Sequence, residues 1–399
     1  MHLTNRQIFQ QYLAIPAKVA NPLEIVEAKG IYIISDTGKR YIDLVSGVSV
    51  SNVGHSNPVV IGAIKNQVDK YMHLMVYGKY IQTPQVSLAQ KLVDNLPDKL
   101  NSVYFVNSGS EAVEGAIKLA KRITGRSGII SFNNAYHGST HGALSVLGNE
   151  EMKNAYRPLL PDIHFFEFNH DDVIKGITNK TACVIMEPIQ TEAGILIPSQ
   201  KWIRDVRNRC TETGTILIFD EVQMGFGRSG KLFAFENFNI IPDILCLAKA
   251  MGSGMPIGAF ISSSDNMNLL THNPVLGHIT TFGGHPVSCA ASLAGLNIIL
   301  EKELHTNADN LGKLFVRLLE NQPKIKEIRQ IGLMLGVEII KPNKVSDLIY
   351  IFQNNGLIVD QFLFNESSFR IAPPLTITED EIKLIVSKII ESLDELDSN

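Results

Sequence analysis

The sequence has little cysteine, no long apolar run and no strong excess of one charge. Its four cysteines, Cys183, Cys210, Cys246 and Cys289, lie far apart without a C-x-x-C pair, which favours buried free thiols in a reducing compartment. No apolar run approaches the ~20 residues of a membrane span, and the first residues show no apolar leader. The net charge is −4 with scattered Lys and Arg, which argues against nucleic acid or a membrane surface as partner. We therefore expect a cytoplasmic protein.

The chain contains enough apolar sequence for a large core. With 399 residues and 45% hydrophobic content, it is too long for one compact unit. Short apolar runs alternate with amphipathic ones, and a helix is predicted over 110–124 with Ser110 as its N-cap. The predicted strands are 102–106, 128–132, 164–168, 181–189, 215–222, 243–248 and 258–263. Strands alternating with helices predict an α/β domain with a mostly parallel sheet.

The two ends of the chain show sequence patterns that differ from the strand–helix alternation of the middle. Residues 30–47 predict a hairpin with Asp36 and Gly38 at its turn. After Pro286 the pattern predicts a long helix over 287–304, a small mixed sheet and a closing amphipathic helix over 378–396. The runs assigned to the small sheet are 332–340, 356–360 and 367–375. We divide the chain into an N-terminal segment (1–50) packing with the small domain, a large domain (51–290) and a small C-terminal domain (291–399).

A glycine pattern in "ILIFDEVQMGFGRSG" matches the expression for a dinucleotide-binding turn. Gly225, Gly227 and Gly230 spell G-x-G-x-x-G after an apolar run. Two carboxylates, Asp220 and Glu221, precede these glycines and would repel a phosphate, and the residues that follow make a poor helix. The glycines therefore do not predict NAD binding.

A different set of residues predicts a phosphate-bearing cofactor. Ser108, Gly109 and Ser110 lie between a strand and a helix, where backbone N–H groups bind anions, although an ordinary serine-capped turn explains this stretch equally well. Asp220 ends one apolar strand, where a carboxylate needs a positive partner. Lys249 ends the next, where burial would lower the pKa of its amine and make it nucleophilic. A phosphate cradle, an anion and an amine together match pyridoxal 5′-phosphate (PLP).

The whole sequence resembles the class III (ω-amino-acid) aminotransferases of PLP fold type I. The likeness is carried by six ordered blocks: "NSGSEAVEGAIKLA", "AYHG", "MEPIQTEAG", "FDEVQMGFGRSG", "LAKAMGSGMPIGA" and "TTFGGHP". It implies an α/β, aspartate aminotransferase-like fold with a mostly parallel central sheet in the large domain and a small α+β C-terminal domain. It also implies PLP as cofactor and transaminase activity.

The resemblance assigns the cofactor contacts residue by residue. Lys249 is implied to form the Schiff base and move the proton, and Asp220 to pair with the pyridine nitrogen. Thr281 resembles the threonine that reaches the phosphate of the neighbouring subunit, which implies a homodimer with a shared site. The other implied contacts are with the phosphate (Ser108, Gly109, Ser110), the ring faces (Tyr136, Val222) and the phenolic oxygen (Gln223). No metal is expected.

Substrate recognition matches the family in part. Arg370 resembles the arginine that clamps the α-carboxylate of glutamate or 2-oxoglutarate, and Glu192 the glutamate that pairs with it until a dicarboxylate enters. Ser139 stands where acetylornithine, ornithine and 4-aminobutyrate enzymes have an arginine for the remote carboxylate. Lys79 and Tyr80 are alternative candidates for that contact, with a solvated cation an equal interpretation of Lys79.

These observations predict a PLP-dependent aminotransferase that moves a terminal amino group from an ω-amino acid to 2-oxoglutarate. The altered position at Ser139 keeps open an amine or β-amino-acid transaminase using pyruvate, or a PLP aminomutase. A catalytically silent relative is disfavoured because Lys249 and Asp220 are both present.

Overall fold

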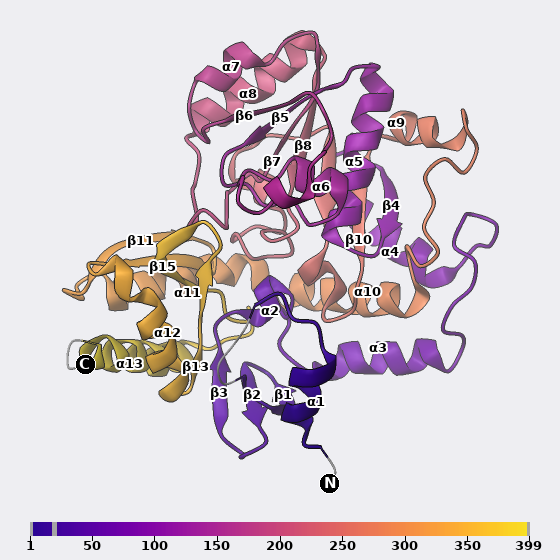
Figure 1. The fold of residues 1–399 in the computed structure, drawn as a ribbon. Helices are drawn as coiled ribbons and strands as arrows, with labels where there is room; N and C mark the ends of the chain where they lie inside the picture. The colour runs from indigo at the N-terminus through magenta and orange to yellow at the C-terminus, as the bar shows by residue number, and fades with distance from the viewer. Residues whose placement is uncertain (1–2, 18–21, 397–399) are drawn as a thin grey trace.

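A seven-stranded sheet forms the centre of the protein, which a computed structural model describes for residues 3–17 and 22–396. The strand order is β4-β10-β9-β8-β7-β5-β6, and only β10 runs against its neighbours (Figure 1). The strands are β4 (Ser102–Val106), β5 (Gly128–Phe132), β6 (Ile163–Phe166), β7 (Thr181–Met186), β8 (Ile216–Asp220), β9 (Ile244–Leu247) and β10 (Gly258–Ser262). The predicted mostly parallel sheet is confirmed.

Helices cover both faces of this sheet, which explains why its inner strands are apolar at nearly every position. Alternate residues of β8 belong to different clusters: Ile218 packs with the helix α5 (Gly109–Thr124), and Leu217 with α8 (Gln200–Thr213). The predicted cap of α5 is wrong by two residues. Ser108, not Ser110, has the extended backbone of an N-cap, and its hydroxyl accepts the N–H of Glu111 at 3.2 Å.

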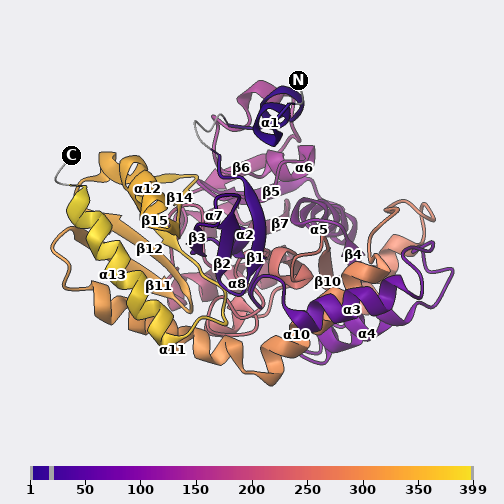
Figure 2. The ribbon, with the colours of Figure 1, turned by 90° about the horizontal axis from the view of Figure 1, so that it is seen from below.

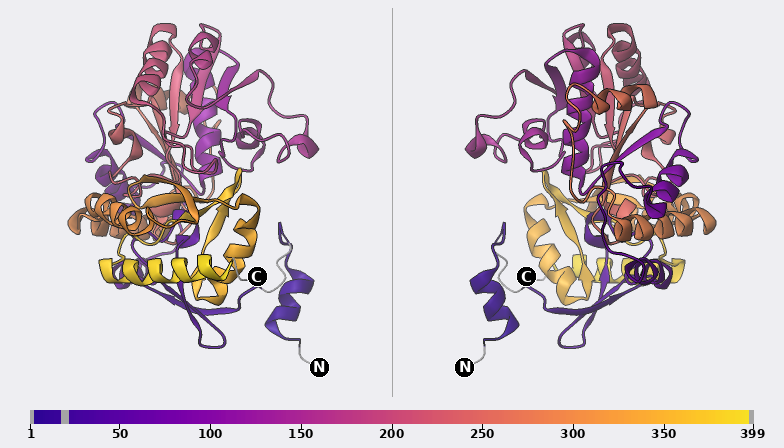
Figure 3. Two further views of the ribbon diagram at one scale, coloured as in Figure 1. Left: turned by 90° about the vertical axis from the view of Figure 1, so that its left-hand side faces the viewer. Right: turned by 90° about the vertical axis from the view of Figure 1, so that its right-hand side faces the viewer.

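The N-terminal part forms a second, four-stranded sheet. The predicted hairpin is present as β2 (Tyr32–Ser35) and β3 (Arg40–Asp43), preceded by β1 (Ile25–Lys29). The fourth strand, β13 (Leu357–Ile358), comes from the C-terminal part and pairs parallel with β3. The helix α1 (Asn5–Tyr12) projects from the body of the molecule (Figure 3).

The C-terminal part forms a third sheet, with order β11-β12-β15-β14, backed by helices (Figure 2). Every pairing in it is antiparallel, so the predicted mixed sheet is wrong. The error arises because the run 356–360 contributes to two sheets: β13 joins the N-terminal sheet, and β14 begins at residue 360. The strands are β11 (Ile325–Ile331), β12 (Met334–Ile339), β14 (Asp360–Phe362) and β15 (Asn365–Ile371).

Of the two helices predicted in this region, one is interrupted and the other is present. The helix predicted over 287–304 stops at Glu301, because Glu303 has a φ of +50° before the next helix begins. The closing helix is α13 (Glu379–Glu395), capped by a reciprocal pair between Thr378 and Glu381. The remaining helices of four or more residues include α2 (Ser46–Ser49), α3 (Pro58–Val68), α4 (Thr83–Val93), α6 (His141–Ser145), α7 (Asp172–Gly176), α9 (Ser264–Asn268), α10 (Pro286–Glu301), α11 (Leu304–Leu319) and α12 (Val345–Asn354). In the part of the chain that the structure describes, no helix has the length and apolar character of a membrane span.

Candidate active site

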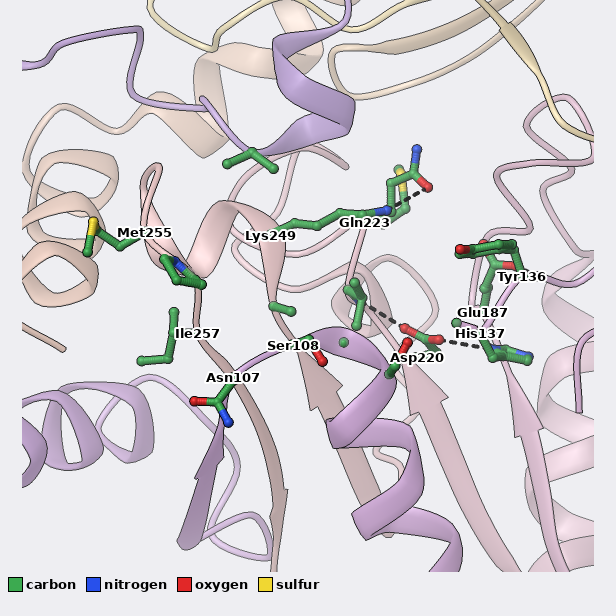
Figure 4. Close-up of a pocket in the computed structure, with 18 of the residues that line it drawn as sticks. Asn107, Ser108, Tyr136, His137, Glu187, Asp220, Gln223, Lys249, Met255 and Ile257 are labelled. Atoms are coloured by element: carbon green, nitrogen blue, oxygen red, sulfur yellow. Dashed lines mark hydrogen bonds and ion pairs between the residues drawn. The ribbon is translucent and has the colours of Figure 1, made fainter. Parts of the chain in front are cut away.

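A pocket of about 480 Å³ opens where the central strands end. Strand carboxyl ends are where open α/β sheets bind ligands. Much of its lining comes from residues expected to bind a cofactor: Ser108, Gly109, Ser110, Tyr136, Asp220, Val222, Gln223 and Lys249 (Figure 4). Residues far apart in the sequence are thus brought to one cavity by the strand order.

One wall of the pocket is the turn that begins α5. The N–H groups of Gly109 and Ser110 belong to the first helical turn, which offers them no intrahelical acceptor. A Cβ added at Gly109 would lie 2.8 Å from Val222 Cγ1, so a side chain does not fit there. Ser139 approaches from the other side, where its N–H donates to Ser110 Oγ at 3.2 Å. This wall is a small anion cradle at a positive helix end.

Gly138 makes the close approach to this cradle possible, and replacing it tests the cradle. Its φ is +124°, and an added Cβ would lie 2.1 Å from Ser110 Oγ. In Gly138→Ala the Ser110 side chain must shift, so we expect PLP affinity to fall roughly 10- to 100-fold, the effect of about 1–3 kcal/mol of overpacking. Fluorescence titration of the apoprotein with PLP measures this.

Gly38→Ala is the matched control for that substitution. Gly38 also has a positive φ, +80°, but an added Cβ would meet nothing within 4 Å. Gly38→Ala introduces the same kind of backbone strain without a steric clash, so PLP affinity should not change. Equal PLP affinities in Gly138→Ala and Gly38→Ala would contradict the assignment of the cradle as the phosphate site.

Asp220 is the last residue of β8 and faces the pocket. It is 5% exposed, and its Oδ1 accepts the N–H of Val222 at 3.0 Å. Its Oδ2 lies 2.8 Å from Nδ1 of His137, whose other ring nitrogen is buried without a hydrogen-bond partner (Figure 4). The carboxylate is therefore oriented on both oxygens. Sequence reasoning assigned no role to His137, although the need of a buried carboxylate for a donor was a usable signal.

Glu221, the other half of the acidic pair, points away from the pocket. Its carboxylate accepts the backbone N–H groups of Ala234 and Phe235. Burial raises the pKa of Glu221 to about 8 against those two hydrogen bonds. It is a structural residue of the loop that follows β8.

Lys249 follows β9, the strand next to β8 in the sheet. It begins a short 3₁₀ turn with a φ of +49°, a strained backbone of the kind found at functional sites. Its Nζ lies 3.3 Å from the side-chain amide of Gln223 (Figure 4). Burial lowers the pKa of the Lys249 amine; Glu192 opposes this shift and Arg370 adds to it. The lower pKa favours the neutral, nucleophilic amine.

Glu187 is a further buried carboxylate of the pocket that sequence reasoning did not single out. Burial raises its pKa, while His137 lowers it and Asp220 raises it. Three donors surround it: the N–H of Tyr136 at 3.2 Å, and the N–H and hydroxyl of Thr191 at 3.0 and 2.6 Å. The two hydrogen bonds from Thr191 oppose the rise in the pKa of Glu187 that burial causes.

Arg370 and Glu192 form a buried ion pair beside Gln223. The two side chains are 1% and 5% exposed, and Arg370 Nη2 lies 2.8 and 2.7 Å from the two Glu192 oxygens. The N–H of Leu363 also donates to Glu192, at 3.1 Å. The guanidinium lies 4.8 Å from the ring centre of Phe362. Such a pair is costly to break unless a ligand replaces one partner.

The other predicted substrate and cofactor residues lie outside the lining of this pocket. Ser139 is exposed, with its hydroxyl 3.3 Å from that of Tyr136. Lys79, Tyr80 and Thr281 are exposed on the surface of the chain. A single chain therefore does not bring these three residues into contact with the cavity.

The glycines of G-x-G-x-x-G serve packing. Gly227 has a φ of +92°, and a Cβ there would lie 2.8 Å from Leu375; Gly230 has a φ of +84° and lies against Gly332. The loop is pressed on the C-terminal part of the chain and begins no helix that would hold a pyrophosphate.

Comparison with known proteins identifies the family. A family model described as "Aminotransferase class-III" matches residues 14–393. The chain belongs to this family. It is 38% identical to an acetylornithine aminotransferase of Methanopyrus kandleri (93% of this chain, 94% of the relative) and 39% identical to one of Methanosarcina mazei (92% and 90%).

Solved structures show the same fold. A transaminase from the marine bacterium Virgibacillus superposes with a TM-score of 0.92 at 26% identity, covering 98% of each chain. The ornithine aminotransferase of Toxoplasma gondii, described with partial occupancy of PLP, gives 0.89 at 28% identity over 99% and 96%. The chain thus has PLP fold type I and is a PLP-dependent transaminase, with an amino donor and a keto acid as substrates.

The residues of the pocket fit this cofactor. The cradle at Gly109 and Ser110 suits a phosphate, which sequence reasoning placed there. The doubly oriented carboxylate of Asp220 suits a protonated ring nitrogen. Lys249 offers an amine of lowered pKa on the same cavity.

Proposed function

We propose that this transaminase transfers the terminal amino group of an ω-amino acid to 2-oxoglutarate. The observation that carries the proposal is the buried Arg370–Glu192 pair next to the lysine pocket. Arginine binds a carboxylate with two parallel hydrogen bonds, and the paired glutamate masks that charge when the other substrate is bound. The acetylornithine aminotransferases among the relatives support an ω-amino acid as donor.

In this proposal each residue has a defined task. PLP, when bound, supplies an electron sink that stabilises negative charge at the reacting carbon. The cradle residues Ser108, Gly109 and Ser110 would bind its phosphate, and Tyr136 and Val222, which also line the pocket, would hold its ring. Asp220, oriented by His137 and the N–H of Val222, holds positive charge at the ring nitrogen. Gln223 hydrogen-bonds near the phenolic oxygen. Lys249 takes the proton from the substrate carbon and delivers it to the cofactor side as a general base and acid.

The pair explains how one pocket accepts two kinds of substrate. When Glu192 is paired with Arg370, this wall of the pocket carries no net charge and accommodates the carbon chain of an ω-amine. When a dicarboxylate enters, its α-carboxylate replaces Glu192 on the guanidinium, so Arg370 is never left unpaired.

The identity of the donor depends on a position where the chain departs from the family. Ser139 supplies neither the charge nor the paired donors of an arginine. This favours, as a second candidate, an amine or β-amino-acid transaminase with pyruvate as acceptor, or an aminomutase. Lys79 or Tyr80, brought in by a second subunit, is the proposed substitute for the missing arginine at the distal carboxylate of 2-oxoglutarate.

A substrate panel tests these alternatives. Ornithine, acetylornithine, 4-aminobutyrate, diamines and β-amino acids are each assayed against 2-oxoglutarate and pyruvate. The proposal expects the highest kcat/KM for an ω-amino acid with 2-oxoglutarate. A preference for pyruvate with every donor would replace it by the second candidate.

We further propose a homodimer whose subunits share the site. Thr281 belongs to the segment 275–283, in which Val275 is 71% and Phe282 54% exposed. This segment lines a cavity together with residues 76–78, close in the chain to Ile81, which is 94% exposed. Large exposed apolar side chains gathered in neighbouring segments are typical of protein–protein interaction surfaces. The chain has a mass of 44.0 kDa, so light scattering should find twice that mass. A fully active monomer would refute the shared site.

A further inference from the structure

Thr191 lies behind the Arg370–Glu192 pair and has no role in the proposal above. It is 0% exposed and precedes Glu192 in the chain. Its hydroxyl lies 2.6 Å from Glu187 Oε2 and 2.9 Å from the side-chain amide of Gln223. The hydroxyl therefore connects a carboxylate of the cofactor pocket with the residue beside Lys249.

The Thr191 hydroxyl can donate only one of its two hydrogen bonds, and the distances indicate which one. A threonine hydroxyl has one proton to donate. Glu187 Oε2, which also accepts the Thr191 N–H at 3.0 Å, takes this proton at the shorter distance of 2.6 Å. The Thr191 oxygen is then an acceptor toward Gln223, so Gln223 turns its NH₂ group to Thr191.

This orientation makes Gln223 complementary to the ion pair. Its NH₂ group donates to Thr191 Oγ1 at 2.9 Å and to Glu192 Oε1 at 3.2 Å, and its oxygen accepts from Arg370 Nη1 at 2.9 Å. Both protons of the NH₂ group are thereby used, and Lys249 Nζ lies 3.3 Å from it without accepting a proton. The reversed amide would place N–H against N–H at Arg370 and oxygen against oxygen at Glu192.

We propose that Thr191 is a positioning residue that orients Gln223 and thereby keeps the Arg370–Glu192 pair closed, setting the balance between ω-amine and dicarboxylate substrates. The inference rests on the proposed function of that pair. Without the hydroxyl, Gln223 loses one of the three contacts that select its orientation, and the closed pair loses part of its support. The open form, which binds dicarboxylates, then becomes more populated.

The test measures the two half-reactions of the holoenzyme separately, together with the binding of glutarate, a dicarboxylate that cannot react. In Thr191→Val we expect the KM for glutamate to fall and the KM for the ω-amine donor to rise. Each change should be about two- to tenfold, the range for one hydrogen bond, with kcat nearly constant. Calorimetry should show glutarate binding tighter by the same factor. Thr191→Ser keeps the hydroxyl and should restore the wild-type ratio.

Thr215→Val is the matched control, because Thr215 is also buried but lies just before β8, at the opposite end of that strand from Asp220. It should lower the melting temperature without changing the ratio of the half-reactions. Unchanged glutarate affinity in Thr191→Val, or an equal loss in both half-reactions, would overturn the inference. Arg370→Met separates the two proposals: if glutarate affinity does not respond to it, the proposed function itself fails.

Discussion

Replacing Lys249 by alanine lowers turnover by at least ~10⁴-fold, the upper range for general acid–base catalysis alone. The reason is that Lys249 is the only lysine lining the described pocket, and burial lowers the pKa of its amine. A second readout is independent of activity. After borohydride reduction, the wild-type peptide containing Lys249 should gain the mass of the reduced cofactor, and the variant should not.

Lys153→Met controls for the loss of a buried lysine. Lys153 is 4% exposed and donates to Leu147 O at 2.8 Å, away from the pocket lining. It should reduce stability while turnover per folded molecule stays the same. Full turnover in Lys249→Ala would exclude the proton transfer proposed for this residue.

Replacing Asp220 by asparagine lowers kcat by roughly 10²–10³-fold, the usual effect of losing one preorganised electrostatic contact. Asparagine keeps the shape and the hydrogen bond with the Val222 N–H, but removes the charge that His137 and the backbone orient. Single-turnover absorbance with a good donor measures the proton-transfer step directly.

Asp243→Asn is the control for that substitution. Asp243 is a carboxylate at the opposite end of the neighbouring strand, paired with Arg207 and the N–H of Leu217. Its replacement should cost stability and leave kcat unchanged. Equal kcat in Asp220→Asn and the wild type would remove the electrostatic role of Asp220.

The central sheet could be predicted from sequence because burial on both faces leaves a local signature. Strands β4 and β5 agree with their predicted bounds, and Lys249 and Asp220 were found as polar residues at the ends of such runs. The small sheet was harder because its pairings join segments distant in the chain. Nothing local in residues 356–360 shows that two adjacent short strands enter different sheets.

The polar network around the pocket was predictable only in part. The family resemblance pointed to Gln223, Glu192 and Arg370. The role of the Thr191 hydroxyl could not be predicted, because it depends on residues that are neighbours only in the folded structure. The displaced cap at Ser108 shows the same limit on a smaller scale. Several serines near a helix start satisfy the pattern, and the backbone conformation selects one.

The burial of Arg228, in the glycine loop after β8, affects how the chain folds during its synthesis. Its guanidinium is fully buried and bonds Asn52 Oδ1, Leu333 O and Pro373 O, the last 145 positions later in the chain. During synthesis on the ribosome, Arg228 cannot be buried with its partners until the C-terminal third of the chain has emerged, because two of those partners lie there. Burying the guanidinium without them is costly. The cofactor core should therefore close only after synthesis is nearly complete, and nascent chains halted near residue 290 should stay protease-sensitive and dependent on chaperones.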